Sequence, residues 1–133
     1  MNPRYPAVAE RARYRCEYCQ APEAIFNLGF EVEHIVPTSR HGKDEASNWA
    51  LACRSCNLHK SDQLEGLDDV TGQVSRLFHP RQDLWKEHFR VDPDTGALVG
   101  LTAIGRVTIS LLQMNRPAQI TARQRWMLLR LFP

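Results

Sequence analysis

The sequence has no long apolar stretch. None of its segments approaches the ~20 consecutive apolar residues that a membrane-spanning helix needs, and no apolar run typical of a secretory leader is present. Internal repeats and low-complexity segments are also missing. With 43% hydrophobic and 24% charged residues, the chain has the composition of a folded globular domain. We therefore expect a cytoplasmic globular protein rather than a membrane, repeat or disordered protein.

Acidic residues are missing from the last part of the chain. From Thr95 to Pro133 there is no Asp or Glu, although the net charge of the whole chain is only +2. The same segment carries five arginines, at Arg106, Arg116, Arg123, Arg125 and Arg130. A basic segment of this kind suits a polyanion such as nucleic acid. The alternative is that these arginines lie on a solvated helix face and balance acids elsewhere.

Cysteine is scarce, and the four cysteines come in two pairs. The pairs are Cys16-x-x-Cys19 and Cys53-x-x-Cys56. Two such knuckles supply the four thiolates of a tetrahedral structural zinc site. Four unrelated buried thiols would not explain the paired spacing, and a redox motif needs only one pair. We therefore expect structural zinc at these four residues.

Hydrophobic periodicity and turn residues divide the chain into short elements. In the first half we expect a helix, a strand, a polar loop, two short helices and a linker, at residues 7–14, 30–36, 38–47, 48–52, 56–60 and 61–72. In the second half we expect a hairpin and two helices separated by Pro117, at residues 90–101, 102–114 and 120–132. The fold class is α+β, with a core at 1–66 and a basic extension at 67–133 packed on or beside it through Trp85, Phe89 and Leu112.

Polar residues of defined types lie between and beside the two cysteine pairs. Thirty-three residues separate Cys19 from Cys53, more than the roughly 15–20 of a plain zinc ribbon. A carboxylate precedes a histidine on the expected strand, an asparagine follows the polar loop, and another asparagine follows the last cysteine. A bare structural ribbon does not need this ordered set.

The stretch from Cys16 to Asp62 resembles the HNH endonuclease family, in the form with two zinc knuckles. The resemblance rests on three pieces in order, namely Glu33-His34-Ile35-x-Pro37, Asn48, and Cys53-x-x-Cys56-Asn57-x-x-Lys60. It implies a ββα-metal HNH core stapled by zinc and hydrolysis of DNA phosphodiester bonds. The second half is similar, more loosely, to the hairpin-plus-helices tail of some stand-alone bacterial HNH proteins.

The resemblance assigns roles to four residues. His34 matches the general base that takes a proton from water, and Asn48 matches the residue that braces the loop and orients the base. Glu33 and Asn57 match the ligands of a catalytic divalent ion, and oxygen ligands favour Mg²⁺ or Mn²⁺. The family more often has Asp at the position of Glu33. Strict strand alternation would also put Glu33 and His34 on opposite faces, so the site requires the strand to end, twist or bulge there.

Further residues are weaker candidates. His59 is a possible substitute metal ligand, and Glu31 can support the site from the same strand face as Glu33. Arg40, Arg54 and Lys60 are the nearest cations for DNA phosphates, although any surface cation would look the same. Two other functions remain open: a non-catalytic zinc module that binds nucleic acid, and a zinc-held protein-interaction domain.

Overall fold

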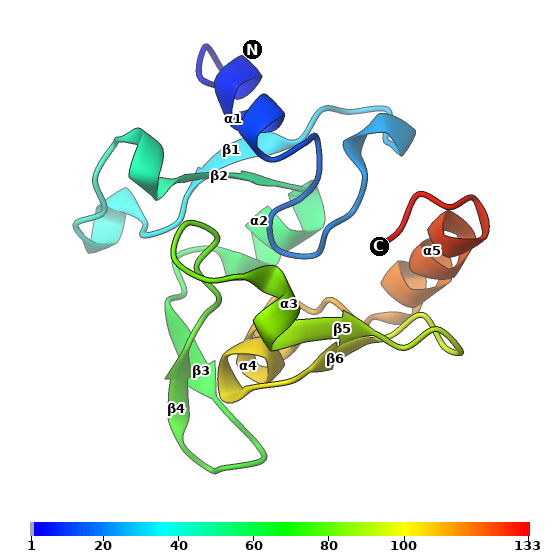
Figure 1. Ribbon diagram of the computed structural model, residues 1–133. Coiled ribbons are helices and arrows are strands. Elements are labelled where there is room, and N and C mark those ends of the chain that lie inside the picture. Colours follow the sequence, from blue (N-terminus) through cyan, green and yellow to red (C-terminus); the bar gives the residue numbers. More distant parts are fainter. Residues whose placement is uncertain (1) are drawn as a thin grey trace.

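The structure is a computed structural model that describes residues 2–133 (Figure 1). Its helices are α1 Tyr5–Arg11, α2 Arg54–Lys60, α3 Trp85–His88, α4 Ala103–Leu111 and α5 Pro117–Leu128. Its strands are β1 Glu31–His34, β2 Trp49–Ala52, β3 Glu65–Leu67, β4 Val74–Arg76, β5 Phe89–Val91 and β6 Leu98–Gly100. The strands form three separate antiparallel pairs, β1–β2, β3–β4 and β5–β6. The expected α+β class is confirmed.

The β1–β2 hairpin and α2 form a ββα unit at the centre of the first half (Figure 1). In the hairpin Glu33 lies opposite Ala50 and His34 lies opposite Trp49. The short helix expected at 48–52 is wrong, because this segment is β2. Pairing with β1 satisfies its backbone hydrogen bonds and buries Ala50, so tertiary context overrides the helical composition of the segment. Helix α2 follows directly and confirms the helix expected through Lys60.

The linker expected at 61–72 is also wrong in part, since it contains β3 and the turn of the β3–β4 hairpin. This hairpin packs against α4. A Cβ atom added at Gly66 would lie 2.5 Å from Leu111 Cδ1, so glycine permits the close approach. In the turn, buried Asp68 accepts hydrogen bonds from Arg106 at 2.9 and 3.0 Å. One of the five arginines of the acid-free segment is therefore used to hold this hairpin.

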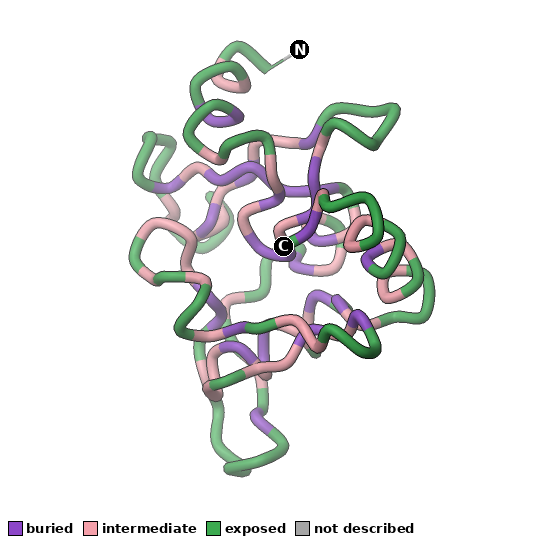
Figure 2. The backbone as a smooth tube through the Cα atoms, turned by 45° about the vertical axis from the view of Figure 1, so that its right-hand side comes forward, coloured by how far each residue is buried: buried purple, intermediate pink, exposed green. Residues whose placement is uncertain are grey.

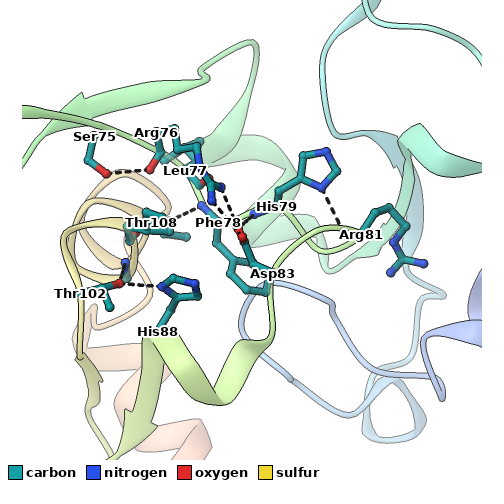
Figure 3. A network of polar contacts seen from close by, with 12 residues as sticks. Ser75, Arg76, Leu77, Phe78, His79, Arg81, Asp83, His88, Thr102 and Thr108 are labelled. Atoms are coloured by element: carbon teal, nitrogen blue, oxygen red, sulfur yellow. Dashed lines mark hydrogen bonds and ion pairs between the residues drawn. The ribbon is translucent and has the colours of Figure 1, made fainter.

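Polar contacts fix the segment that joins β4 to α3 (Figure 3). Arg76 donates two hydrogen bonds to Asp83, at 2.7 and 2.9 Å. The backbone N–H of Phe78 donates to Thr108 of α4 at 2.9 Å. His88 and Thr102 lie 2.7 Å apart through Nδ1 and Oγ1. The Phe78 bond ties the connecting segment to α4, the His88 contact ties α3 to the N-cap of α4, and the Arg76–Asp83 pair holds the segment to β4.

The C-terminal elements agree with the sequence in type. The β5–β6 hairpin is confirmed, with Gly96 at φ 78° in its turn. Helix α4 is confirmed, and the Thr102 side chain accepts a hydrogen bond from the Gly105 N–H as its N-cap. Helix α5 starts at Pro117 rather than after it, because proline suits the first turn of a helix, where no N–H partner is needed.

One hydrophobic core joins the two halves of the sequence. It includes Tyr18 and Leu51 from the first half and Phe89, Leu112 and Met114 from the second. Figure 2 shows the buried stretches gathered toward the middle of the molecule, with exposed turns around them. The Trp85 indole N–H donates to the Tyr18 carbonyl at 2.8 Å, which places α3 against the first cysteine pair. Within residues 2–133 no helix is both long and apolar enough to cross a membrane.

Candidate metal centre and active site

The four cysteines converge in a buried cluster. The sulfur atoms of Cys16, Cys19, Cys53 and Cys56 all lie within 4.8 Å of one another. Cys19 and Cys53 sulfurs are 3.8 Å apart, which matches the edge of about 3.8 Å expected for a tetrahedron with Zn–S bonds of about 2.3 Å. The cluster therefore fits a closed structural zinc site with no position left for substrate.

Backbone N–H groups point at two of these sulfurs. The Cys19 N–H donates to Cys16 Sγ at 3.5 Å, and the Cys56 N–H donates to Cys53 Sγ at 3.4 Å. Cys53 is also the N-cap of α2, so the metal cluster and the helix start share one residue. Hydrogen bonds, first of all from Cys16, hold the pKa of the Cys53 thiol well below its usual range. The pKa values of the Cys19 and Cys56 thiols are instead raised, first of all by hydrogen bonds with Cys16, so zinc, which binds thiolates, must displace protons from the cluster.

His34 is the last residue of β1 and is half-buried beside the polar loop. Its Nε2 lies 2.9 Å from Oδ1 of Asp44. Asp44 is not among the residues that the sequence singled out. It lies ten residues after His34 in a polar loop, and no spacing rule connects the two, so only the folded loop reveals the contact.

Asn48 ties the two ends of that loop together. Its Oδ1 accepts from the Val36 N–H at 2.8 Å, and its Nδ2 donates to the carbonyls of Val36 and Lys43 at 2.9 and 2.7 Å. The Asn48 carbonyl accepts from the Ile35 N–H at 2.8 Å. Asn48 is buried and braces the loop.

Glu33 faces the interior, away from solvent. Its carboxylate accepts hydrogen bonds from the Tyr18 hydroxyl and from the Lys60 ammonium, the latter at 3.1 Å. Burial raises the pKa of Glu33, and the neighbouring Lys60 and Tyr18 act in the opposite direction. Glu33 and His34 do lie on opposite faces of β1, as strict alternation requires. The expected ion ligand is thus engaged inside the protein.

Asn57 contacts a different carboxylate, that of Glu31. The Asn57 amide nitrogen donates to Glu31 Oε2 at 2.5 Å, and Arg54 lies 3.4 Å from Glu31 Oε1. An open depression of about 260 Å³ lies beside this contact. Its lining consists of Val32, Glu33, His34, Pro37, Thr38, Asn57 and Ser61. The structure therefore brings His34, Asn57 and the buried Glu33 to the lining of one depression, and it places Glu31 next to Asn57.

The weaker candidates for DNA contact and metal binding differ in how far they are buried. Arg54 is exposed, and Arg40 is exposed and 4.0 Å from Asp62. Lys60 is buried and presents no charge to solvent in this arrangement. The His59 Nδ1 lies 2.7 Å from the Ser55 carbonyl. Since His59 follows Asn57 by two residues, it points to the other side of α2 and not into the depression.

A ββα-metal module is formed by the β1–β2 hairpin and α2. The four-cysteine cluster, which has the geometry of a structural zinc site, holds it together. Residues 16–63 match the model of the family described as HNH endonuclease. This segment is therefore an HNH module in its four-cysteine form. The chain matches no curated protein and no solved structure in these comparisons. The match associates this segment with nuclease-like activity on nucleic acid.

Proposed function

We propose that this protein is a metal-dependent endonuclease that hydrolyses DNA phosphodiester bonds. The observation that carries the proposal is the shared depression of His34 and Asn57 inside an HNH module. Hydrolysis needs a base for the attacking water and charge stabilisation for the phosphate. A half-exposed histidine and an amide on the neighbouring helix supply suitable groups for both tasks.

In this proposal His34 acts as the general base. With Nε2 facing Asp44, its Nδ1 is the atom that can take a proton from water, a function worth roughly 10²–10⁴ in rate. Asn48 holds the loop that carries Asp44 against the hairpin. A divalent ion, Mg²⁺ or Mn²⁺, would polarise the phosphate and stabilise the leaving oxygen.

Asn57 and a carboxylate of β1 are the oxygen donors available to such an ion. The amide nitrogen of Asn57 already donates to Glu31, so the amide oxygen is the donor atom for an ion. Glu33 is the carboxylate that the HNH resemblance assigns to the ion, but it reaches one only by leaving Lys60 unpaired. Glu31 needs no such change. Either carboxylate is compatible with the proposed chemistry, and separate variants distinguish them.

Exposed arginines at α2 support DNA as the substrate. Arg54 is 79% exposed at the start of α2. Arg116 is exposed and donates to Ser55 on the same helix at 3.2 Å. In contrast, Arg106 and Arg123 are engaged with Asp68 and with backbone carbonyls. Only part of the acid-free segment is therefore free to meet phosphates, and binding is expected to weaken as salt rises.

Plasmid cleavage with Mg²⁺ or Mn²⁺ tests the proposal. We expect His34→Ala to remove most activity while its zinc content and thermal stability stay unchanged. His41→Asn is the matched control, because His41 has φ 66°, a conformation that asparagine tolerates, and has no assigned role. Equal cutting by the parent and His34→Ala would contradict the proposal. DNA binding without cleavage under any divalent ion would instead indicate a non-catalytic zinc module.

A further inference from the structure

Three elements meet at the carboxylate of Asp44. His34 Nε2 at the end of β1 lies 2.9 Å from Oδ1, and the Trp49 indole N–H of β2 donates to the same oxygen at 3.1 Å. Arg4, immediately before α1, donates to Oδ2 at 2.5 Å. Asn48 braces the loop that carries Asp44, because its side-chain amide donates a hydrogen bond to the carbonyl of Lys43, the residue before Asp44. The carboxylate is therefore held in place on both oxygens.

Arg4 and Trp49, which both bind Asp44, also contact each other. The Arg4 guanidinium lies over the Trp49 ring, 4.6 Å from its centre. Trp49 is the cross-strand partner of His34 in the β1–β2 hairpin. Arg4 lies outside residues 16–63, the segment that matches the HNH family. The N-terminal segment thus reaches the histidine through Asp44.

We infer that Asp44 is a positioning residue for the His34 base, and that Arg4 and Trp49 keep its carboxylate in place. This inference rests on the proposed function of His34. Accepting the Nε2–H fixes the imidazole tautomer in which Nδ1 carries the lone pair. The fixed tautomer and ring orientation point the Nδ1 lone pair at the attacking water. A carboxylate hydrogen-bonded to the other ring nitrogen has this effect on catalytic histidines in general.

The proton balance of the step is simple. Nδ1 takes one proton from water while the water oxygen bonds to phosphorus and the bond to the leaving ester oxygen breaks. That oxygen is protonated from solvent. His34 then carries both ring protons, and the ionised Asp44 stabilises the resulting positive charge. The hydrogen bond from His34 lowers the pKa of Asp44, which keeps this carboxylate ionised at neutral pH.

The experiment compares Asp44→Ala, Asp44→Asn and a control, Asp69→Asn, which removes the same charge at an exposed position distant in sequence. We expect Asp44→Ala to lower kcat for plasmid cleavage by about tenfold to a hundredfold, a part of the ~10²–10⁴ of a general base. KM and thermal stability should change little. Asp44→Asn keeps an acceptor without the charge and should lie between. Asp69→Asn should match the parent.

Two further measurements separate positioning from a structural role. In a His34→Ala background, Asp44→Ala should cause no additional loss, because a residue that acts through His34 has nothing left to position. Nitrogen NMR of labelled histidine should show His34 protonated at Nε2 in the parent and a mixture of tautomers in Asp44→Ala. This readout needs no cleavage, so it tests the contact even if the nuclease proposal fails.

Four results would overturn the inference. One is unchanged kcat in Asp44→Ala, and another is an equal loss with and without His34. The third is an Nδ1-protonated tautomer of His34 in the parent protein. A fall in thermal stability that accounts for the whole loss of activity would likewise assign Asp44 to the fold alone.

Discussion

The ammonium of Lys60 lies 3.1 Å from the carboxylate of Glu33 in the protein interior, with only 2% and 5% of the two side chains exposed. Lys60 also donates to the His34 carbonyl at 3.3 Å, and Tyr18 binds the second oxygen of Glu33. This buried pair links α2 to β1 and to the first cysteine knuckle. Two residues of the HNH pattern thus hold the hairpin that carries His34.

Glu33→Gln should destabilise the protein by about 3–5 kcal/mol, because it leaves the Lys60 charge buried without its partner. Urea unfolding of the zinc-loaded protein measures the loss. The double variant Glu33→Leu/Lys60→Met removes both charges and should recover much of it. A Glu33→Gln variant as stable as the parent would show that Lys60 finds another partner or solvent.

Glu31→Gln should raise the Mg²⁺ concentration needed for half-maximal cleavage by about tenfold, because Glu31 is the carboxylate beside Asn57. Its thermal stability should stay close to that of the parent, since the Glu31 side chain is 41% exposed and glutamine keeps an acceptor for Asn57. Glu65→Gln, on an exposed strand, is the matched control. If the Mg²⁺ dependence of Glu31→Gln is unchanged, Glu33 and not Glu31 is the carboxylate that binds the ion.

Cys53→Ala should abolish the folded state. Structural zinc contributes on the order of 10–16 kcal/mol, which equals or exceeds the ~5–15 kcal/mol stability of a domain. Cys53 is in addition the N-cap of α2, so its loss removes a metal ligand and a helix cap together. Zinc content and circular dichroism test this expectation. A soluble, folded variant without zinc would contradict the structural role of the cluster.

Arg123→Met should cost about 3 kcal/mol of stability, the scale of hydrogen bonds to a charged group in the interior. The Arg123 guanidinium is buried and donates to the carbonyls of Gly96 and Met114, both at 2.8 Å. It therefore joins α5 to the β5–β6 turn. Arg125→Met, two residues on and exposed, should be nearly neutral in thermal unfolding. Equal stability of both variants would exclude this role for Arg123.

Asp83→Asn should weaken the dependence of the free energy of unfolding on pH below about pH 4. The hydrogen bonds from Arg76 lower the pKa of Asp83 from 3.8 to about 2 in the folded protein. A depressed folded pKa adds stability above the unfolded value, and this contribution is lost as the pH falls from about 4 to about 2. The difference between parent and variant, measured by urea unfolding, should therefore be constant above pH ~5 and shrink below pH ~4. A constant difference down to pH ~2 would contradict this assignment.

Local patterns in the sequence determined much of this protein. The paired spacing of the cysteines predicts the thiol cluster, since each knuckle needs only four consecutive residues. The Asp92–Gly96 turn signal predicts the β5–β6 hairpin, and Thr102 with its apolar period predicts α4. Within each knuckle, within the hairpin turn and within α4, residues close in sequence make the deciding contacts, whereas the meeting of the two knuckles is a tertiary contact.

Tertiary structure decided the rest. Residues 49–52 form β2 because they pair with β1. The Glu33 side chain lies in the interior because Lys60 and Tyr18 donate hydrogen bonds to its carboxylate there. Asp44 reached His34 only because a braced loop brings it back to the hairpin. The physical reason is common to all three: strand pairing, side-chain direction and loop contacts depend on partners distant in sequence, and no local period encodes them.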